Sequence, residues 1–274
     1  MFEPVIKWSG SKRSQADKII SYFPKEIDTY YEPFCGGASV LRRLLSSDIK
    51  VKEYVSSDLN DDLIALWNEI IDHPEEVILH YKKLWSELNV DDDKERKKEY
   101  FYVIRDRYNK ERNPLDFMFI MRTTTNGMPR YNKQGDFNNS FHVTRNGINP
   151  NTLEKIVYEW NEILNEKEVK FISCSYEEIE PKENDFLYLD PPYANTKGMY
   201  YGVIDYDKFW DWLRQLPCKY ALSFDGISGK ENNTYNLPQD VYSRHEYLLS
   251  GNSSFKRIVG KSKDSIVYES LYLK

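Results

Sequence analysis

The sequence predicts an α/β protein with a Rossmann-like sheet and an inserted, mostly helical subdomain. Strand-like and helix-like segments alternate near both ends of the chain, which is typical of a mostly parallel sheet. A glycine turn, Cys35-Gly36-Gly37, follows the first strand-like segment, as in nucleotide-binding α/β folds. The middle of the chain instead carries consecutive helical patterns. A length of 274 residues accommodates one large α/β domain with such an insertion.

The first strand–turn–helix–strand unit lies between residues 29 and 58. Residues 29–34 are strand-like and enter the glycine turn, and residues 52–58 predict the next strand. Between them, apolar side chains at helical spacing predict a helix with one buried face, formed by Val40, Leu41, Leu44 and Leu45. This unit forms the first half of the predicted nucleotide-binding fold.

The inserted subdomain spans residues 60–150. Helical spacing of apolar residues predicts helices beginning near Leu63 and Val77, and further helices over 94–108 and 114–122. Residues 123–149 are rich in Asn, Gly, Thr and Arg and predict a loop or hairpin. We therefore expect two domains, one formed by residues 1–59 and 151–274 and the other by residues 60–150.

Alternation of helix and strand resumes after the insertion. The expected elements are, in order, a helix over 153–164, strands over 169–173 and 186–189, a helix around 209–213, and strands over 220–224 and 265–273. These elements would complete the sheet that the first unit begins.

A rigid polar corner, Asp190-Pro191-Pro192-Tyr193, follows the buried strand over 186–189. Two consecutive prolines end the strand, and the residue before a proline stays extended. The corner therefore lies at the carboxyl edge of the sheet, where open α/β sheets bind ligands. Its carboxylate and a proline carbonyl suit the two N–H bonds of an exocyclic NH2 group, and Tyr193 suits a flat ring. The alternative is that the tetrapeptide only terminates the strand.

Asp58 ends a strand about 20 residues after the glycine turn of Gly36 and Gly37. An acid at this spacing commonly binds the hydroxyl groups of a ribose. Because a complete G-x-G-x-x-G is missing, a nucleoside-type ligand is favoured over a dinucleotide. The alternative is that Asp58 only caps the helix that opens at Asn60.

Composition excludes several classes of protein. Hydrophobic residues make up 40% and charged residues 30% of the chain, and no apolar run reaches membrane-spanning length. No signal peptide is visible, and three scattered cysteines indicate a reducing cytoplasm. Four unclustered histidines predict no metal site. The net charge of −6 argues against nucleic acid, but two stretches are locally basic: Arg122, Arg130, Lys133 and Arg145, and Lys256, Arg257, Lys261 and Lys263.

Five segments occur in the order known from one family. They are Lys7-Trp8-Ser9-Gly10-Ser11-Lys12, Glu32-Pro33-Phe34-Cys35-Gly36-Gly37-Ala38, Asp58-Leu59-Asn60, Asn126-Gly127-Met128-Pro129-Arg130-Tyr131-Asn132 with Gly135-Asp136-Phe137-Asn138, and Asp190-Pro191-Pro192-Tyr193. Together they resemble the Dam-type (D12 class, alpha group) S-adenosylmethionine-dependent DNA adenine-N6 methyltransferases. The resemblance covers almost the full length. It implies that residues 1–59 and 151–274 form a catalytic cofactor-binding domain and residues 60–150 a target-recognition subdomain.

The resemblance also implies residue roles. S-adenosylmethionine would be bound by Trp8, Lys12, Phe34, Gly36, Gly37, Asp58, Tyr176 and Asp190. Catalysis would use Asp190, Pro191, Pro192 and Tyr193. DNA would be bound by Lys7, Arg122, Asn126, Met128, Arg130, Asn132, Lys256 and Arg257. Within that set, Lys7 and Arg130 would reach guanine edges, for which arginine is a common reader, and Asn126 and Met128 would lie near the extruded base.

The expected reaction is direct methyl transfer to N6 of an adenine flipped out of double-stranded DNA. Asp190 and the Pro191 carbonyl would accept both N6 hydrogens while Tyr193 stacks on the base. No metal, membrane or obligate protein partner is expected. Departures from the family pattern at Ser11, Ser175, Thr125 and residues 139–142 leave the target as a short adenine-containing site, with GATC as one option.

Three alternatives remain open at this point. A cytosine-N4 methyltransferase uses the same chemistry, but Ser usually replaces Asp in its tetrapeptide, so Asp190 favours adenine. An RNA adenine methyltransferase is less consistent with the inserted subdomain and its Arg- and Asn-rich hairpin. A catalytically silent DNA-binding regulator is less consistent with the intact tetrapeptide.

Overall fold

The computed structural model describes residues 2–142, 144, 146–193, 204–252 and 266–274. The chain folds into two compact units. The helical unit comprises mainly Met1–Gly10 and Asp58–Ser173, and the sheet unit comprises Ser11–Ser57, Cys174–Lys197 and Val203–Lys274. The helical unit thus includes two stretches, 1–10 and 151–173, that the sequence assigned to the catalytic domain. The functional division into 1–59 with 151–274 and 60–150 stays a prediction.

The strands of the sheet unit lie in the order β2-β1-β4-β5-β8-β7, and β6 pairs with β5. Their bounds are Lys50–Asp58 (β2), Glu26–Glu32 (β1), Phe186–Leu189 (β4), Lys219–Ser228 (β5), Ile266–Leu273 (β8), Arg244–Asn252 (β7) and Glu231–Asn232 (β6). From β2 to β5 the pairing is parallel, whereas β8 runs antiparallel to both β5 and β7. The predicted α/β class with a Rossmann-like sheet is confirmed.

The register of the central strands sets the place of the polar corner. Tyr31 of β1 lies opposite Leu187 of β4, and Leu189 lies opposite Leu222 of β5. Because parallel strands present their carboxyl ends at the same edge, the turn after β1 and Asp190 after β4 leave the sheet on one side. All four residues of β4 are buried, as its uninterrupted apolar sequence predicts.

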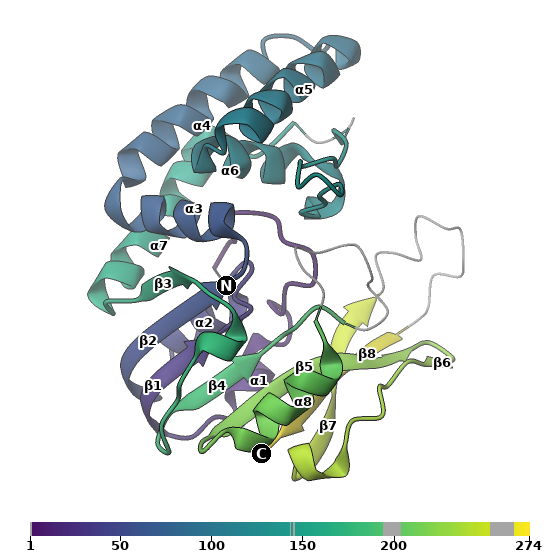
Figure 1. The fold of residues 1–274 in the computed structure, drawn as a ribbon. Helices are drawn as coiled ribbons and strands as arrows, with labels where there is room; N and C mark the ends of the chain where they lie inside the picture. Colours follow the sequence, from purple (N-terminus) through teal and green to yellow (C-terminus); the bar gives the residue numbers. More distant parts are fainter. Residues whose placement is uncertain (1, 143, 145, 194–203, 253–265) are drawn as a thin grey trace. The chain divides into compact units, whose positions relative to one another are not determined.

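Helices cover both faces of this sheet (Figure 1). The helices of the unit are α1 (Ala16–Ile20), α2 (Ser39–Leu45) and α8 (Tyr206–Gln215). Phe209 of α8 belongs to a buried cluster with Leu187 and Leu189 of β4. On the opposite face, Phe23 after α1 packs against Phe186, with ring centroids 4.5 Å apart. This alternation along β4 follows from the two-residue period of a strand, and it buries both faces of the central sheet.

In the described part of the helical unit, five helices pack against one another, as can be followed in Figure 1. They are α3 (Asp61–Asp72), α4 (Pro74–Leu88), α5 (Lys94–Glu111), α6 (Pro114–Thr123) and α7 (Pro150–Glu166), followed by β3 (Lys170–Ser173). The Trp67 ring of α3 lies 4.8 Å from Trp160 of α7 and 5.0 Å from Phe171 of β3, between ring centroids. The predicted helices of residues 60–150 are therefore present, and they share a core with α7.

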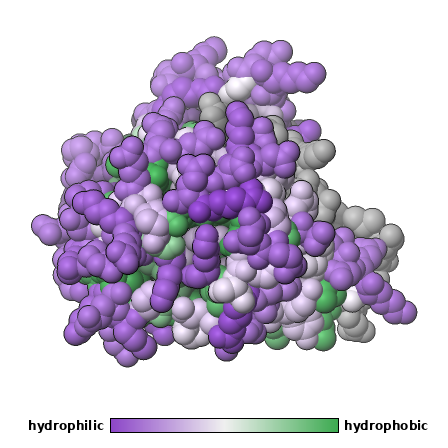
Figure 2. All heavy atoms as spheres, turned by 60° about the horizontal axis from the view of Figure 1, so that its bottom comes forward, coloured by the Kyte–Doolittle hydropathy of each residue, from purple (hydrophilic) through white to green (hydrophobic). Residues whose placement is uncertain are grey.

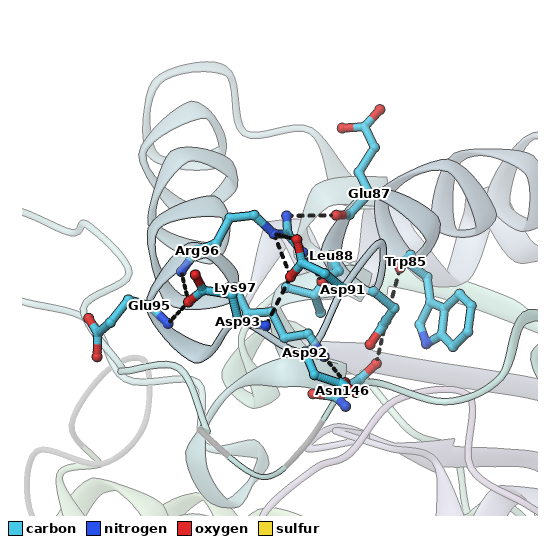
Figure 3. Close-up of polar contacts among 11 residues, drawn as sticks. Trp85, Glu87, Leu88, Asp91, Asp92, Asp93, Glu95, Arg96, Lys97 and Asn146 are labelled. Carbon is cyan, nitrogen blue, oxygen red and sulfur yellow. Dashed lines mark hydrogen bonds and ion pairs between the residues drawn. The ribbon is translucent and has the colours of Figure 1, made fainter.

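The acidic run of residues 91–93 closes the turn between α4 and α5 (Figure 3). Asp93 caps α5, because its Oδ1 accepts the backbone N–H of Arg96 at 3.2 Å. The Arg96 guanidinium in turn donates to the carbonyl oxygens of Glu87 (3.0 Å) and Leu88 (2.7 Å), at the end of α4. Asp93 thus caps α5, and Arg96 of the same helix connects it to the end of α4.

Among the described residues, no group of three or more His, Cys, Asp or Glu side chains could hold a metal ion.

One face of the protein is largely polar. Figure 2 shows a face on which hydrophilic residues predominate and hydrophobic residues occur only in small groups. None of the helices in the described part of the chain combines the length and the apolar character that crossing a membrane requires.

Candidate active site

The polar corner after β4 holds a buried ion pair. The Lys12 ammonium lies 2.7 Å from Oδ2 of Asp190 and 3.5 Å from Oε2 of Glu269, which is on β8. The Lys12 side chain is only 4% exposed, and the two carboxylates are 18% and 19% exposed. One buried cation is therefore shared between two acids from different elements.

Burial and neighbouring charges act in opposite directions on Asp190. Burial raises the pKa of Asp190 to about 6; the Lys12 charge and hydrogen bond work against this rise, and the Glu269 charge adds to it. Asp190 is consequently a carboxylate at neutral pH and gains its proton close to pH 6. As a carboxylate, Asp190 can accept hydrogen bonds from an amine, and it can also take up a proton that the amine releases.

Two tyrosines fix the rest of the corner. The Tyr193 hydroxyl donates to Oε2 of Glu269 at 3.3 Å, and its ring packs against Phe224 with centroids 5.5 Å apart. The Tyr206 hydroxyl of α8 donates to the carbonyl oxygen of Pro192 at 2.6 Å. The Pro192 carbonyl is therefore engaged within the protein, while the Pro191 carbonyl is the one that the sequence assigned to an exocyclic amine.

The glycine turn after β1 bends the chain sharply into α2. Gly36 and Ala38 both have positive φ, of 46° and 51°, and the Ala38 N–H donates to the Cys35 carbonyl at 2.7 Å. Glycine adopts the left-handed conformation without strain, which accounts for glycine at position 36. Phe34, just before the turn, lies beside Tyr176, with ring centroids 5.7 Å apart. Tyr176 begins η2 (Tyr176–Glu178). The two rings predicted to contact one ligand are thus neighbours.

The carboxyl end of β2 carries Asp58, half-buried, whose Oδ1 accepts the backbone N–H of Asn60 at 3.1 Å. Asn60, not Asp58, caps α3, because its Oδ1 accepts the N–H of Leu63 at 3.1 Å. The Asn60 amide also donates to the Tyr131 hydroxyl at 3.1 Å. Helix capping is therefore carried out by Asn60, which weakens the alternative that Asp58 serves only as a cap.

Residues 124–141 form a hairpin with antiparallel bridges between Thr124 and Phe141 and between Tyr131 and Phe137. We call this segment the recognition hairpin. Arg130 is exposed on it, and its carbonyl accepts the N–H of Asn138 at 2.9 Å. The preceding η1 (Thr125–Gly127) is half-exposed at Asn126, which has a positive φ of 60°. The hairpin thus presents polar side chains on a hydrogen-bonded frame.

The N-terminal segment packs against this hairpin. The Ser9 N–H donates to the Gly127 carbonyl at 3.0 Å. A Cβ added at Gly127, where φ is +60°, would come within 2.7 Å of the Lys7 Cβ. Only glycine therefore lets Lys7 approach the recognition hairpin so closely.

Comparison with known proteins identifies this arrangement. The family model described as D12 class N6 adenine-specific DNA methyltransferase matches residues 8–250. The chain belongs to this family. A type II methyltransferase of Methanocaldococcus jannaschii, M.MjaIII, is 32% identical to the chain over 94% of it and 91% of the relative. M1.LlaDCHI, another type II methyltransferase, from Lactococcus lactis, is 28% identical over 87% and 84%. The DNA adenine methylase of Escherichia coli K12 is 30% identical over 69% and 64%.

The structure of this adenine-specific DNA methyltransferase shows what two of the predicted DNA-binding residues, Arg122 and Asn132, contact within the protein. Arg122 is only 5% exposed, and its guanidinium donates to the carbonyl oxygens of Pro4 and Val5. Burial lowers the pKa of Arg122 to about 10. Arg122 therefore holds the N-terminal segment, and its contact with DNA stays a prediction. Asn132 likewise serves the hairpin turn, because its Oδ1 accepts the N–H of Asp136 at 2.9 Å.

The other predicted residues fall into three groups. The Lys12 ammonium pairs with Asp190, and its expected contact with the cofactor stays a prediction. Lys7, Asn126, Met128 and Arg130 share the helical unit and are each at least partly exposed. Lys256 and Arg257 lie outside the described residues.

Three further residues of the methyltransferase escaped the sequence reasoning. Glu269 and Tyr206 contact the polar corner but lie 76 and 14 residues from their partners, in segments with no motif. Glu32 does lie in a motif; it is 3% exposed, accepts the Tyr30 hydroxyl at 2.6 Å, and burial raises its pKa to about 8. The signal for Glu32 was an acid ending a buried strand.

Proposed function

We propose that this methyltransferase transfers the methyl group of S-adenosylmethionine to N6 of an adenine flipped out of a short sequence in double-stranded DNA. The observation that carries the proposal is the corner after β4, where a carboxylate, a proline carbonyl and a tyrosine follow one another at the carboxyl edge of the sheet. Family membership supports the reaction class. The donor, the duplex and the flipping are our inference.

The residues around the glycine turn fit a nucleoside-type cofactor. The left-handed turn at Gly36 and Ala38 keeps the backbone free of bulky side chains, and Phe34 and Tyr176 offer neighbouring aromatic faces. Asp58 ends the strand beside β1, as an acid that binds ribose hydroxyls does. We retain Gly37 and Trp8 as contacts on the resemblance of their motifs. When bound, S-adenosylmethionine supplies a methyl group on a positively charged sulfur.

Asp190 and the Pro191 carbonyl would accept the two hydrogens of the target amine, and Tyr193 would stack on the base. These bonds withdraw the nitrogen lone pair from the ring system and orient it toward the methyl group. The nitrogen becomes positively charged as it gains the methyl group, and the Asp190 carboxylate stabilises that charge. Asp190 can then take a proton, because its pKa of about 6 lies near neutrality. Most of the rate enhancement would come from positioning.

Lys7 and Arg130 would read guanine edges beside the target, and Asn126 and Met128 would lie near the extruded base. An exposed arginine on a hydrogen-bonded hairpin suits bidentate recognition of guanine O6 and N7. The names of the type II relatives support restriction–modification as the setting. Three free thiols, at Cys35, Cys174 and Cys218, support a cytoplasmic location.

The proposal is tested by Asp190→Asn, with Asp211→Asn on the exposed surface of α8 as the control. Single-turnover transfer of a tritiated methyl group to duplex DNA is measured beside a thermal melt. We expect a loss of at least about a hundredfold for Asp190→Asn, since the acceptor and proton site are both changed. The control should match the wild type. Near-normal turnover of Asp190→Asn would overturn the proposed role of the corner.

A further inference from the structure

Glu269 on β8 joins the catalytic corner from outside every motif of the chain. It lies beyond residues 8–250, which the family model matches. Its Oε2 accepts the Tyr193 hydroxyl at 3.3 Å and lies 3.5 Å from the Lys12 ammonium. Its Oε1 accepts the Ser250 hydroxyl of β7 at 3.1 Å. The Glu269 carboxylate therefore contacts both the Tyr193 hydroxyl and Lys12, the lysine that pairs with Asp190.

The shared ammonium makes Glu269 a competitor of Asp190. A lysine paired with Asp190 alone would neutralise that carboxylate and weaken it as an acceptor for the target amine. The second carboxylate draws part of the ammonium's hydrogen bonding away. The hydroxyl contact meanwhile fixes the rotation of Tyr193, whose ring also lies 5.1 Å from the Lys12 ammonium.

We propose that Glu269 is a positioning residue of the methyltransferase, which aims the Tyr193 ring and balances Lys12 so that Asp190 keeps its full acceptor strength. The inference rests on the proposed function of the corner. It adds a residue of β8 to a machinery that the motifs place in residues 7–193. Glu269 touches neither the target base nor the cofactor in this account, and acts through Tyr193 and Lys12.

The charges around Asp190 give the proposal a distinctive signature in the pH dependence. The groups that face Asp190 are Lys12, Glu32, Tyr188, Tyr193 and Glu269. The Glu269 charge raises the pKa of Asp190, whereas Lys12 and the Tyr193 hydroxyl lower it. Asp190 acts as a carboxylate, so activity falls as the pH drops through its pKa. Removing the Glu269 charge should therefore move the acid limb to lower pH, and removing Lys12 or the Tyr193 hydroxyl should move it to higher pH.

The experiment compares Glu269→Gln with Glu246→Gln, a matched control on β7 whose carboxylate pairs with Arg244. Cross-strand pairing of Glu246 with Leu271 and of Leu248 with Glu269 places both glutamates on one face of the sheet. Single-turnover methylation of duplex DNA is measured from pH 5 to pH 8. We expect Glu269→Gln to lower the plateau rate by about tenfold, as positioning losses do, with the acid limb at lower pH. Glu246→Gln should change neither.

Two further variants keep the test decisive. Glu269→Asp keeps the negative charge on a shorter side chain, so its acid limb should lie at the wild-type pH while its plateau rate stays reduced. This variant also tests the proposal if the Glu269→Gln protein does not fold. Tyr193→Phe should shift the limb in the opposite direction. A wild-type plateau in Glu269→Gln, or a reduced plateau with an unmoved limb, overturns the proposal. A wild-type enzyme that transfers no methyl group to adenine overturns the proposed function instead.

Discussion

Replacement of Lys12 by methionine should show how much the ion pairs of Lys12 with Asp190 and Glu269 stabilise the polar corner. The ammonium lies 2.7 Å from Asp190 and 3.5 Å from Glu269, and its side chain is 4% exposed. Removing one partner of a buried ion pair costs about 3–5 kcal/mol of unfolding free energy. Because the carboxylates keep 18% and 19% exposure, we expect the lower end of that range at pH 8.

The loss should depend on pH. The folded-state pKa of Asp190 is about 6, above the value of about 3.9 in unfolded chains, so the folded protein binds more protons between these values. Stability linked to Asp190 therefore decreases as the pH rises from about 4 to 6. Without Lys12 the pKa of Asp190 rises further. The decrease should then extend to higher pH, and Lys12→Met should be less destabilising at pH 5 than at pH 8.

Urea denaturation at pH 5 and pH 8 measures both effects. Lys208→Met, at an exposed position of α8, is the matched control and should cost less than about 0.5 kcal/mol at either pH. If Lys12→Met destabilises the protein no more than the control at pH 8, the ion pairs of Lys12 do not stabilise the fold. An equal loss at both pH values would show that the two carboxylates are not the source of the destabilisation.

Two more predictions concern the recognition hairpin. Arg130→Ala should reduce discrimination at one base pair of the target by about 1–3 kcal/mol, whereas Lys133→Ala, also at an exposed position, should leave the methylated DNA sequence unchanged. Sequencing-based mapping of methylated sites compares the two variants. An unchanged target sequence in Arg130→Ala would refute the reading of a base by Arg130. Gly127→Ala and Gly135→Ala both place alanine at a positive φ, which costs about 1–2 kcal/mol. Only at Gly127 does the new Cβ also meet Lys7, so the melting temperature of Gly127→Ala should fall further than that of Gly135→Ala. Equal shifts would refute close packing of Lys7 against Gly127.

Local patterns predicted the elements that local forces determine. β4 is an apolar run ended by two prolines, and α3 is an amphipathic helix capped by Asn60; both appear where the sequence placed them. β7 (Arg244–Asn252) was missed because its sequence mixes polar and apolar residues, and it becomes a strand only by pairing with β8, which lies further along the chain. The short helix α1 was missed for lack of a capping side chain.

Motifs predicted the chemistry of the site but not its partners. The carboxylate of Asp190 was identified from four residues, whereas its pairing with Lys12 and Glu269 depends on contacts across most of the chain. For Arg122 the sequence indicated a role but not the contacts that it makes within the protein. Its charge indicated DNA, but the carbonyl oxygens of Pro4 and Val5 that accept its hydrogen bonds are backbone groups, which leave no trace in a sequence pattern.

The reaction that we propose is methylation of N6 of adenine in duplex DNA. Its most direct test is mass spectrometry of the nucleosides released after incubation with S-adenosylmethionine carrying a deuterated methyl group. Duplex DNA, single-stranded DNA and RNA are offered separately. We expect labelled N6-methyldeoxyadenosine, formed fastest from duplex DNA and absent with Asp190→Asn. Labelled N4-methyldeoxycytidine, or label in RNA alone, would contradict it.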